Sequence, residues 1–162
     1  MLIVDASPLI HLARLSLLEL LREHDAAGEV VAPAIVFEEV MRGASHDPSA
    51  LLVARAARDW LAIAPTPPPH PSLDPSRIDP GETAVLSLAL AAPGAVAVID
   101  DLAARTRADR LGIRKTGTLR ILIDAKRRGS IPSVQIPLDR LKRMGMHLTD
   151  AIYREVLNQA GE

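Results

Sequence analysis

Acidic residues come directly after two apolar runs of this 162-residue sequence. Asp5 follows the apolar run 2–4, and the pair Asp100-Asp101 follows the apolar run 95–99. If both runs are parallel strands, these carboxylates lie at the same edge of one sheet, which is where ligands bind in such folds. Carboxylates crowded at one edge raise each other's pKa, and a hard divalent cation relieves their repulsion.

The ligands that the sequence offers narrow the choice of metal. The sequence has no cysteine, and its five histidines show no metal-ligand spacing, so we expect neither sulfur nor imidazole ligands. Carboxylates without such partners favour Mg²⁺ or Mn²⁺ over zinc. A cation of this kind can generate hydroxide from water and stabilise the charge that develops on a phosphate group.

Each acidic residue also has a purely structural explanation. Asp5 could cap the helix that follows it, and Asp101 could be the N-cap of the next helix after its own strand. Glu82 could form a capping box with Asp79, because the pattern D-x-x-E places it at the third helical position. Glu39 could be an ordinary solvated helix residue. The second acid beside Asp101 is harder to explain, since one cap needs one acid and a neighbour adds repulsion.

Short apolar runs alternate with helical segments along the chain. The predicted strands are 2–4, 29–32, 95–99 and 113–116, with 61–63 as either a short strand or a helix end. The predicted helices are 8–15, 17–24 with Ser16 as its cap, 34–42, 48–59, 83–92, 102–111, 118–128, 137–144 and 149–160. This alternation predicts an α/β fold with a mostly parallel sheet.

The proline-rich segment 65–80 holds 7 of the 13 prolines, which is too many for a helix or a central strand. We expect an extended surface loop there. The segment is short for a linker and neither flank could fold alone, so the chain length favours one domain.

The charge is divided unevenly along the chain. Residues 1–104 carry 6 Lys/Arg and 14 Asp/Glu, whereas residues 105–162 carry 13 Lys/Arg and 6 Asp/Glu. This asymmetry indicates a polyanion partner, or simply solvated basic faces on the later helices. No signal peptide and no apolar run long enough for a membrane span is expected, and the absence of cysteine fits a cytoplasmic protein.

Four segments together resemble PIN-domain nucleases, the fold of VapC-type toxins. They are Ile3 to Leu9, Glu39 to Gly43, Asp79 to Ala84 and Val98 to Asp101. Two further segments, 115–119 and 125–133, resemble a little-characterised PIN branch whose members are often described as predicted nucleic-acid-binding proteins. The resemblance covers the whole chain.

The resemblance implies a three-layer α/β/α domain with a mostly parallel sheet of four to five strands and a C-terminal helical extension. Residues 1–130 would form the nuclease domain, and residues 131–162 the helical extension of that same domain. The implied function is a metal-dependent endoribonuclease, the toxin component of a toxin–antitoxin pair. Its cofactor would be Mg²⁺ or Mn²⁺, and its partners would be RNA, an antitoxin protein and a second copy in a homodimer.

The resemblance also assigns roles residue by residue. Asp5, Glu39 and Asp101 match the acids usually assigned to metal binding and catalysis in this family. Glu82 matches a fourth such acid, at a position where the better-studied toxins generally have Asp, so its longer side chain would reach the metal differently. Asp100 matches a position that is often not acidic, and it would be a further metal ligand or a residue that orients the ligands.

Two supporting residues complete the predicted site. Ser7 resembles the family's hydroxyl beside the first Asp, and it would bond to that carboxylate or to a water. Arg105 lies four residues after Asp101, one turn along the same helix, so we expect it either to position a phosphate or to form a salt bridge with a site carboxylate.

Two other interpretations remain open at the level of sequence. The chain could be a catalytically inactive PIN-like module that binds nucleic acid or protein. A phosphoryl-transfer domain with an Asp nucleophile is less consistent, because Asp5-Ala6-Ser7 lacks a second Asp two residues on and no Gly-rich phosphate loop is present.

Overall fold

The computed structural model describes residues 1–24, 28–74, 76 and 78–162. Its centre is a sheet of five strands, all parallel, in the order β3-β2-β1-β4-β5. The strands are β1 (Leu2–Val4), β2 (Val30–Pro33), β3 (Leu61–Ala64), β4 (Val96–Val98) and β5 (Arg114–Thr116). The predicted α/β class with a parallel sheet is therefore confirmed, and the ambiguous segment at 61–63 is a strand.

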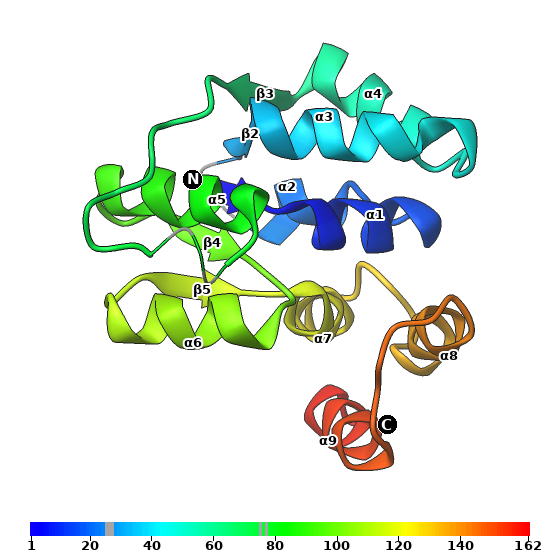
Figure 1. Cartoon of the computed structure of the whole chain (residues 1–162). Coiled ribbons are helices and arrows are strands. Elements are labelled where there is room, and N and C mark those ends of the chain that lie inside the picture. Colours follow the sequence, from blue (N-terminus) through cyan, green and yellow to red (C-terminus); the bar gives the residue numbers. More distant parts are fainter. Residues whose placement is uncertain (25–27, 75, 77) are drawn as a thin grey trace.

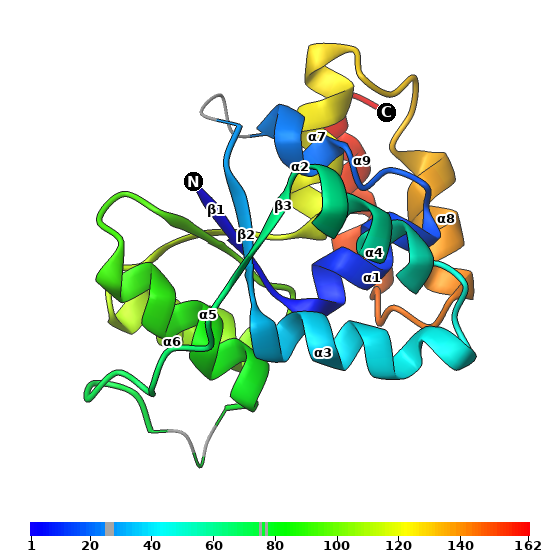
Figure 2. The same ribbon diagram turned by 90° about the horizontal axis from the view of Figure 1, so that it is seen from above.

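Helices connect the strands and extend the chain at its C-terminal end (Figure 1). They are α1 (Ala6–Arg14), α2 (Leu20–His24), α3 (Ala34–Arg42), the 3₁₀ turn η1 (Gly43–Ser45), α4 (Ala50–Asp59), α5 (Pro80–Ala91), α6 (Leu102–Arg110), α7 (Thr118–Arg128), α8 (Gln135–Arg143) and α9 (Asp150–Ala160). Figure 2 shows α5 and α6 on one side of the sheet and α1, α2 and α7 on the other. The domain therefore has three layers, as expected.

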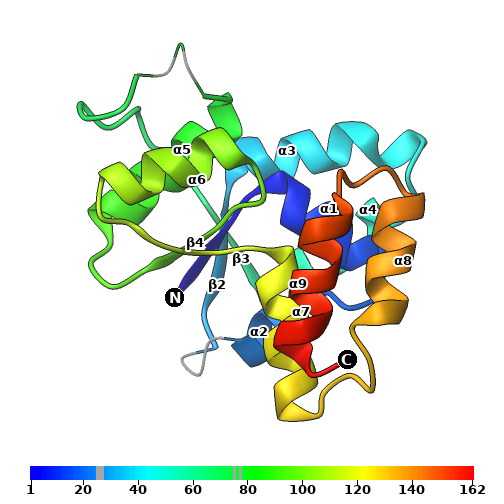
Figure 3. The ribbon, with the colours of Figure 1, turned by 90° about the horizontal axis from the view of Figure 1, so that it is seen from below.

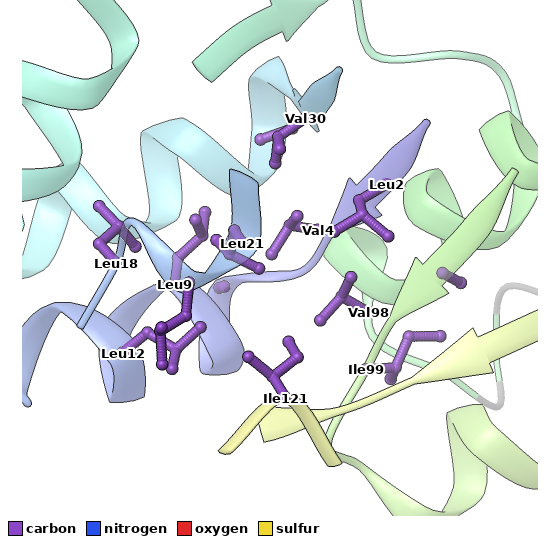
Figure 4. Close-up of a cluster of buried hydrophobic side chains, with 14 of the residues drawn as sticks. Leu2, Val4, Leu9, Leu12, Leu18, Leu21, Val30, Val98, Ile99 and Ile121 are labelled. Carbon is purple, nitrogen blue, oxygen red and sulfur yellow. The ribbon is translucent and has the colours of Figure 1, made fainter. Parts of the chain in front are cut away.

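The core between the sheet and the helices is aliphatic, because the sequence has few aromatic residues. Figure 4 shows Val4 and Val98 on neighbouring strands close to Leu9 of α1, Leu21 of α2 and Ile121 of α7. All five side chains are fully buried. Complete burial of a side chain of this size contributes about 1.5–3 kcal/mol, so the central strands are held firmly in register.

The second helix is shorter than predicted, because Ser16 does not cap it. Ser16 has a left-handed backbone with φ of 59° and ends α1. Its N–H donates to the Ala13 carbonyl at 2.9 Å, and the N–H of Leu17 donates to the Leu12 carbonyl at 2.8 Å. This pair of bonds is the Schellman pattern of a helix C-terminus, so α2 begins only at Leu20.

The last two helices pack against the body of the domain. Leu138 and Leu141 of α8 and Val156 of α9 belong to the same apolar core as the sheet. The division of the chain near residue 130 stays a prediction. None of the described helices is long and apolar enough to cross a membrane.

Glu162 holds the start of α8 and gives a testable prediction about stability. Its carboxylate accepts hydrogen bonds from the Val134 N–H and the Ser133 hydroxyl at 2.7 Å each, and these bonds, opposed by burial, lower its pKa. We expect Glu162→Gln to reduce the free energy of unfolding by about 1 kcal/mol at pH 7, the usual effect of a lost helix cap.

The effect of Glu162→Gln should depend on pH. A carboxyl group with a lowered folded-state pKa stabilises the fold above its ordinary pKa, and this stabilisation is lost as the pH falls through the folded-state value. Denaturant unfolding at pH 7 and pH 3 measures the difference, with the exposed Glu155→Gln on α9 as the control. If the free energies of unfolding of Glu162→Gln and the wild type differed by the same amount at pH 7 and pH 3, the ionised Glu162 carboxylate would not hold the start of α8.

Candidate active site

The carboxyl ends of β1 and β4 lie side by side at the point where the order of the strands reverses. The N–H of Asp5, directly after β1, donates to the Val98 carbonyl at the end of β4 at 3.1 Å. The chain continues from Val98 into Asp100 and Asp101, and then into α6. In open parallel sheets ligands bind in the crevice at such a reversal point.

Two helices bring further acids to this edge of the sheet. Figure 3 shows α3 at the end of the sheet toward which β1 runs, with α5 beside it. Glu39 lies in the second turn of α3, and Asp79 precedes the first turn of α5. A Cβ atom built on Gly81 of α5 would lie 3.2 Å from Glu39 Oε2, 3.3 Å from Asp79 Oδ1 and 3.4 Å from Asp5 Oδ1. Carboxylates from three separate elements therefore surround one point.

Asp5 has the most unusual electrostatic environment of the group. Only 5% of the residue is exposed, and burial raises the pKa of its carboxyl to about 7. The nearby charges of Glu82, Glu39 and Asp79 contribute to this rise of the pKa, while a hydrogen bond from the Ala6 N–H opposes it. Among the described residues no Lys or Arg pairs with Asp5. A buried, unpaired carboxyl that titrates near neutrality is typical of functional sites.

The pKa values of two further carboxyls connect these acids electrostatically. Burial raises the pKa of Glu39, and Asp79 adds to the rise while Arg42 reduces it. Burial also raises the pKa of Glu82, and the charge of Asp101 is the next largest cause. Asp5, Glu39, Asp79, Glu82 and Asp101 therefore form one acidic cluster, a name kept below for these five residues.

Three members of the acidic cluster also cap helices. Asp79 Oδ1 accepts from the Gly81 N–H at 2.8 Å, and Glu82 Oε2 accepts from the Asp79 N–H at 3.3 Å, which completes a capping box on α5. Asp101 Oδ1 accepts from the Ala104 N–H at 2.8 Å and caps α6. The structural explanation and membership of the cluster are thus compatible, because one carboxylate has enough lone pairs for a cap and another partner.

Asp79 is the member of the cluster that the sequence did not indicate as a site residue. Its place in the D-x-x-E pattern was sufficient to explain it as a cap. One feature of the sequence could have indicated Asp79. The D-x-x-E pattern places Asp79 at the start of the same helix that carries the predicted site residue Glu82. The side chain of an N-cap lies beside the first turn, so an acid there shares the environment of an acid in that turn.

Asp100 is placed differently from Asp101. Its Oδ1 accepts from the Thr118 N–H at 2.8 Å, and its Oδ2 lies 2.6 Å from the Thr118 hydroxyl and 2.9 Å from His11 Nδ1. Oδ1 is therefore bonded to α7, and Oδ2 is bonded to both α7 and α1. Its charge is not among the causes that raise the pKa of Asp5, Glu39 or Glu82. A role for Asp100 in metal binding stays a prediction, which this geometry does not favour.

The two supporting residues also have defined positions. Arg105 Nη1 donates to the carbonyls of Ile99 at 2.8 Å and Thr116 at 3.0 Å, so it ties the ends of β4 and β5 together. Among the described residues it forms no ion pair with a carboxylate of the cluster. Ser7 is exposed in the first turn of α1, two residues after Asp5. A phosphate contact by Arg105 and a hydrogen bond by Ser7 stay predictions.

The chemistry of the cluster fits a hard divalent cation. All five side chains offer carboxylate oxygens, which Mg²⁺ and Mn²⁺ prefer, and the chain has no thiol that would favour zinc. A cation would also relieve the repulsion that raises the pKa of Asp5. As the side chains of the described residues stand, no group of three or more His, Cys, Asp or Glu residues is arranged to hold a metal ion.

Comparison with known proteins identifies the family. The DUF3368 family model, described as a PIN domain, matches residues 1–162, so the chain belongs to this PIN-domain family. No curated protein and no solved structure matches the chain. The match to this family model confirms the family predicted from the sequence. The PIN domain is generally a metal-dependent nuclease fold, which agrees with the carboxylates gathered at this edge of the sheet.

Proposed function

We propose that this protein is a metal-dependent endoribonuclease that hydrolyses RNA phosphodiesters with Mg²⁺ or Mn²⁺. The observation that carries the proposal is the buried carboxyl of Asp5, whose pKa burial and the neighbouring acids raise to about 7. Such an arrangement destabilises the fold by itself, and functional sites are where such arrangements are found. Membership of the PIN-domain family supports the reaction class.

Asp5, Glu39, Glu82 and Asp101 would hold the cation. When bound, it would polarise a phosphodiester and the attacking water, as divalent cations do in hydrolases. Burial and neighbouring charges raise the pKa of Glu39 and Glu82, and a bound cation would offset both causes of this rise by pairing with these carboxylates. Asp5, on a rigid strand end, would fix the position of the other ligands.

The substrate that we propose is RNA, and the distribution of basic residues supports a polyanion. Arg107 and Arg110 lie on α6, the helix that Asp101 caps. An RNA strand that leaves the site along this helix would therefore contact them. Other basic residues stabilise the fold instead. Arg127 Nη2 donates to the Gln159 carbonyl at 2.7 Å, and Lys126 bonds to the Pro132 carbonyl, which holds the C-terminal segment against α7.

The cellular setting is also a proposal. Resemblance to VapC-type toxins supports a toxin–antitoxin pair in the cytoplasm, with residues 131–162 as a helical extension of the nuclease domain. A homodimer is supported by the exposed side chains of Leu51 and Leu52 on α4, which are 65% and 40% accessible. Neighbouring exposed leucines of this kind mark protein interfaces more often than scattered single ones do.

The test is cleavage of a mixed RNA pool with Mg²⁺ or Mn²⁺, compared with the same reaction in EDTA. Wild type should cleave only with metal, and Glu39→Gln should reduce the rate at least about 100-fold. Glu38→Gln is the matched control, because Glu38 is the exposed neighbour on the same helix and should leave the rate unchanged.

Failure of a folded wild type to cleave with either metal would contradict the proposal. It would favour the inactive PIN-like module, and binding of the same RNA pool without cleavage would then identify a nucleic-acid-binding protein. Cleavage that is insensitive to EDTA, or equal in Glu39→Gln and Glu38→Gln, would also reject the acidic cluster as the site.

A further inference from the structure

A cavity of about 260 Å³ lies between α7, α9 and the segment that leads from β4 into α6. Four apolar side chains line it, from α7, from α9 and from the segment that precedes α9: Leu119, Ile123, Met146 and Val156. Asp100 and Arg105 line it as well. Figure 3 shows α9 beside α7, so the cavity combines the end of the sheet with the C-terminal helices.

The cavity lies next to the acidic cluster. Asp100 directly precedes Asp101, which belongs to the cluster, and successive Cα atoms are only about 3.8 Å apart. Arg105 lies one helical turn further on, since its N–H donates to the Asp101 carbonyl at 3.0 Å. An RNA strand with a phosphate at the cluster can therefore place a neighbouring base in this cavity.

Arg105 presents a fixed guanidinium group to the cavity. Its Nη1 donates to two backbone carbonyls, those of Ile99 and Thr116, whereas its Nε and Nη2 have no hydrogen-bond partner within the described part of the chain. Gly117 makes this position possible, because an added Cβ would lie 2.9 Å from both Arg105 Nη1 and the Ile99 carbonyl oxygen. One edge of the guanidinium is thus held by the strand ends, and the other keeps its donors.

We propose that this cavity binds one guanine base of the RNA substrate, beside the phosphate that is cleaved, and that Arg105 selects guanine. This inference rests on the proposed function and adds a base preference to it. Guanine presents two adjacent acceptors, O6 and N7, which an arginine meets with two N–H groups at once. Adenine has an amino donor in place of O6, and this donor would face the donors of Arg105.

The lining and the size of the cavity favour a base over a phosphate. A phosphate would lose its hydration against the four apolar side chains, whereas the flat faces of a base pack well on them. Pockets for drug-sized ligands measure about 300–1,000 Å³, so this smaller cavity suits a single base. Proteins that recognise single-stranded RNA bind unstacked bases in this way, by their faces and their edges.

The experiment measures RNA binding by fluorescence anisotropy in EDTA, where no cleavage occurs. Two labelled RNAs of six nucleotides are compared, both of uridines except for one central guanine or one central adenine. The wild type should bind the guanine-containing RNA at least about tenfold more tightly, which is the discrimination expected of one bidentate contact. Equal affinities for the two RNAs, or no binding of either, would overturn the inference.

Two variants connect this preference to the cavity. Lysine at Arg105→Lys keeps a cation that can donate to the two carbonyls but has no planar fork, so the preference should disappear. Met146→Trp fills the cavity from its wall and should remove the preference too. Met144→Trp is the matched control, because Met144 is 36% exposed, does not line the cavity and should leave the preference unchanged.

The outcomes separate this inference from the proposed function. Circular dichroism first confirms that each variant is folded, and if one of the two is not, the other decides. A guanine preference that persists in a folded Arg105→Lys or Met146→Trp protein would overturn the inference. If the wild type cleaves RNA with metal but shows no base preference, the inference fails alone. If the preference depends on the cavity as expected but no RNA is cleaved with either metal, the base site stands and the nuclease function fails.

Discussion

Asp5→Asn is expected to abolish RNA cleavage and, in the absence of metal, to make the protein more stable at pH 8. The two effects have one cause. Burial, and after it the charges of the neighbouring acids, raise the pKa of the Asp5 carboxyl to about 7, compared with an ordinary value of 3.8. Asparagine keeps the shape of the side chain but has no charge to bury. The folded state therefore becomes more stable, while the metal loses a carboxylate ligand.

The sign of the pH dependence follows from the raised pKa. Between pH 3.8 and about 7 the folded state binds the Asp5 proton more tightly than the unfolded state does, so stability falls as the pH rises through this window. The penalty is complete above pH 7. A difference of about three pH units corresponds to a penalty on the order of 4 kcal/mol, which Asp5→Asn should remove.

The measurement is the free energy of unfolding from pH 4 to pH 8 in EDTA. The wild type should lose stability across this range relative to Asp5→Asn, and the exposed Asp59→Asn on α4 should follow the wild type. Mg²⁺ or Mn²⁺ should then raise the midpoint of the wild type but not that of Asp5→Asn, because a ligand stabilises only the state that binds it. If the free energies of unfolding of the wild type and Asp5→Asn changed with pH in parallel, ionisation of Asp5 would not destabilise the fold, which would contradict the prediction.

The parts of this fold that the sequence predicts are those that depend on local pattern. The alternation of apolar runs and helical segments located four of the five strands and left 61–63 as either a strand or a helix end, because periodicity alone does not separate a short apolar run in a strand from one in a helix. It also placed Asp5 and Asp101 at one edge, since parallel strands end on the same side. Glu39 was different: helical spacing alone makes it an ordinary surface residue, and only the family resemblance pointed to it.

The parts that the sequence did not predict depend on hydrogen bonds and side-chain contacts that the residue types do not reveal. Ser16 is a reasonable N-cap by composition, and the bond from Leu17 back to Leu12 that ends α1 cannot be read from the residue types. Asp79 was explained fully by its capping pattern, so nothing called for a second role. Asp100 was indicated as a ligand because no local structure needs it, whereas its partners Thr118 and His11 are 18 and 89 residues away.

Asp100→Ala should reduce the free energy of unfolding by about 2–4 kcal/mol while leaving Mn²⁺ affinity near that of the wild type. The side chain is only 11% exposed, and its two oxygens serve the Thr118 N–H, the Thr118 hydroxyl and His11 Nδ1. Hydrogen bonds to a charged group contribute about 1.5–3 kcal/mol each, and their loss leaves buried donors without partners. These contacts join the end of β4 to α1 and α7, so we expect Asp100 to act as a positioning residue.

The matched variant is Asp101→Ser, at the neighbouring position. Serine keeps the cap on α6, so the free energy of unfolding should change little, while the loss of a carboxylate beside Glu82 should reduce cleavage at least about 100-fold. Three measurements on both variants separate the two roles: denaturant unfolding, Mn²⁺ binding and RNA cleavage. Binding and cleavage are measured below the unfolding midpoint of the less stable variant. A stable Asp100→Ala protein that cannot bind Mn²⁺ would make Asp100 a ligand and reverse the assignment. If the two variants instead behave as expected, then of two adjacent aspartates Asp100 supports the strand ends and Asp101 belongs to the acidic cluster that binds the metal.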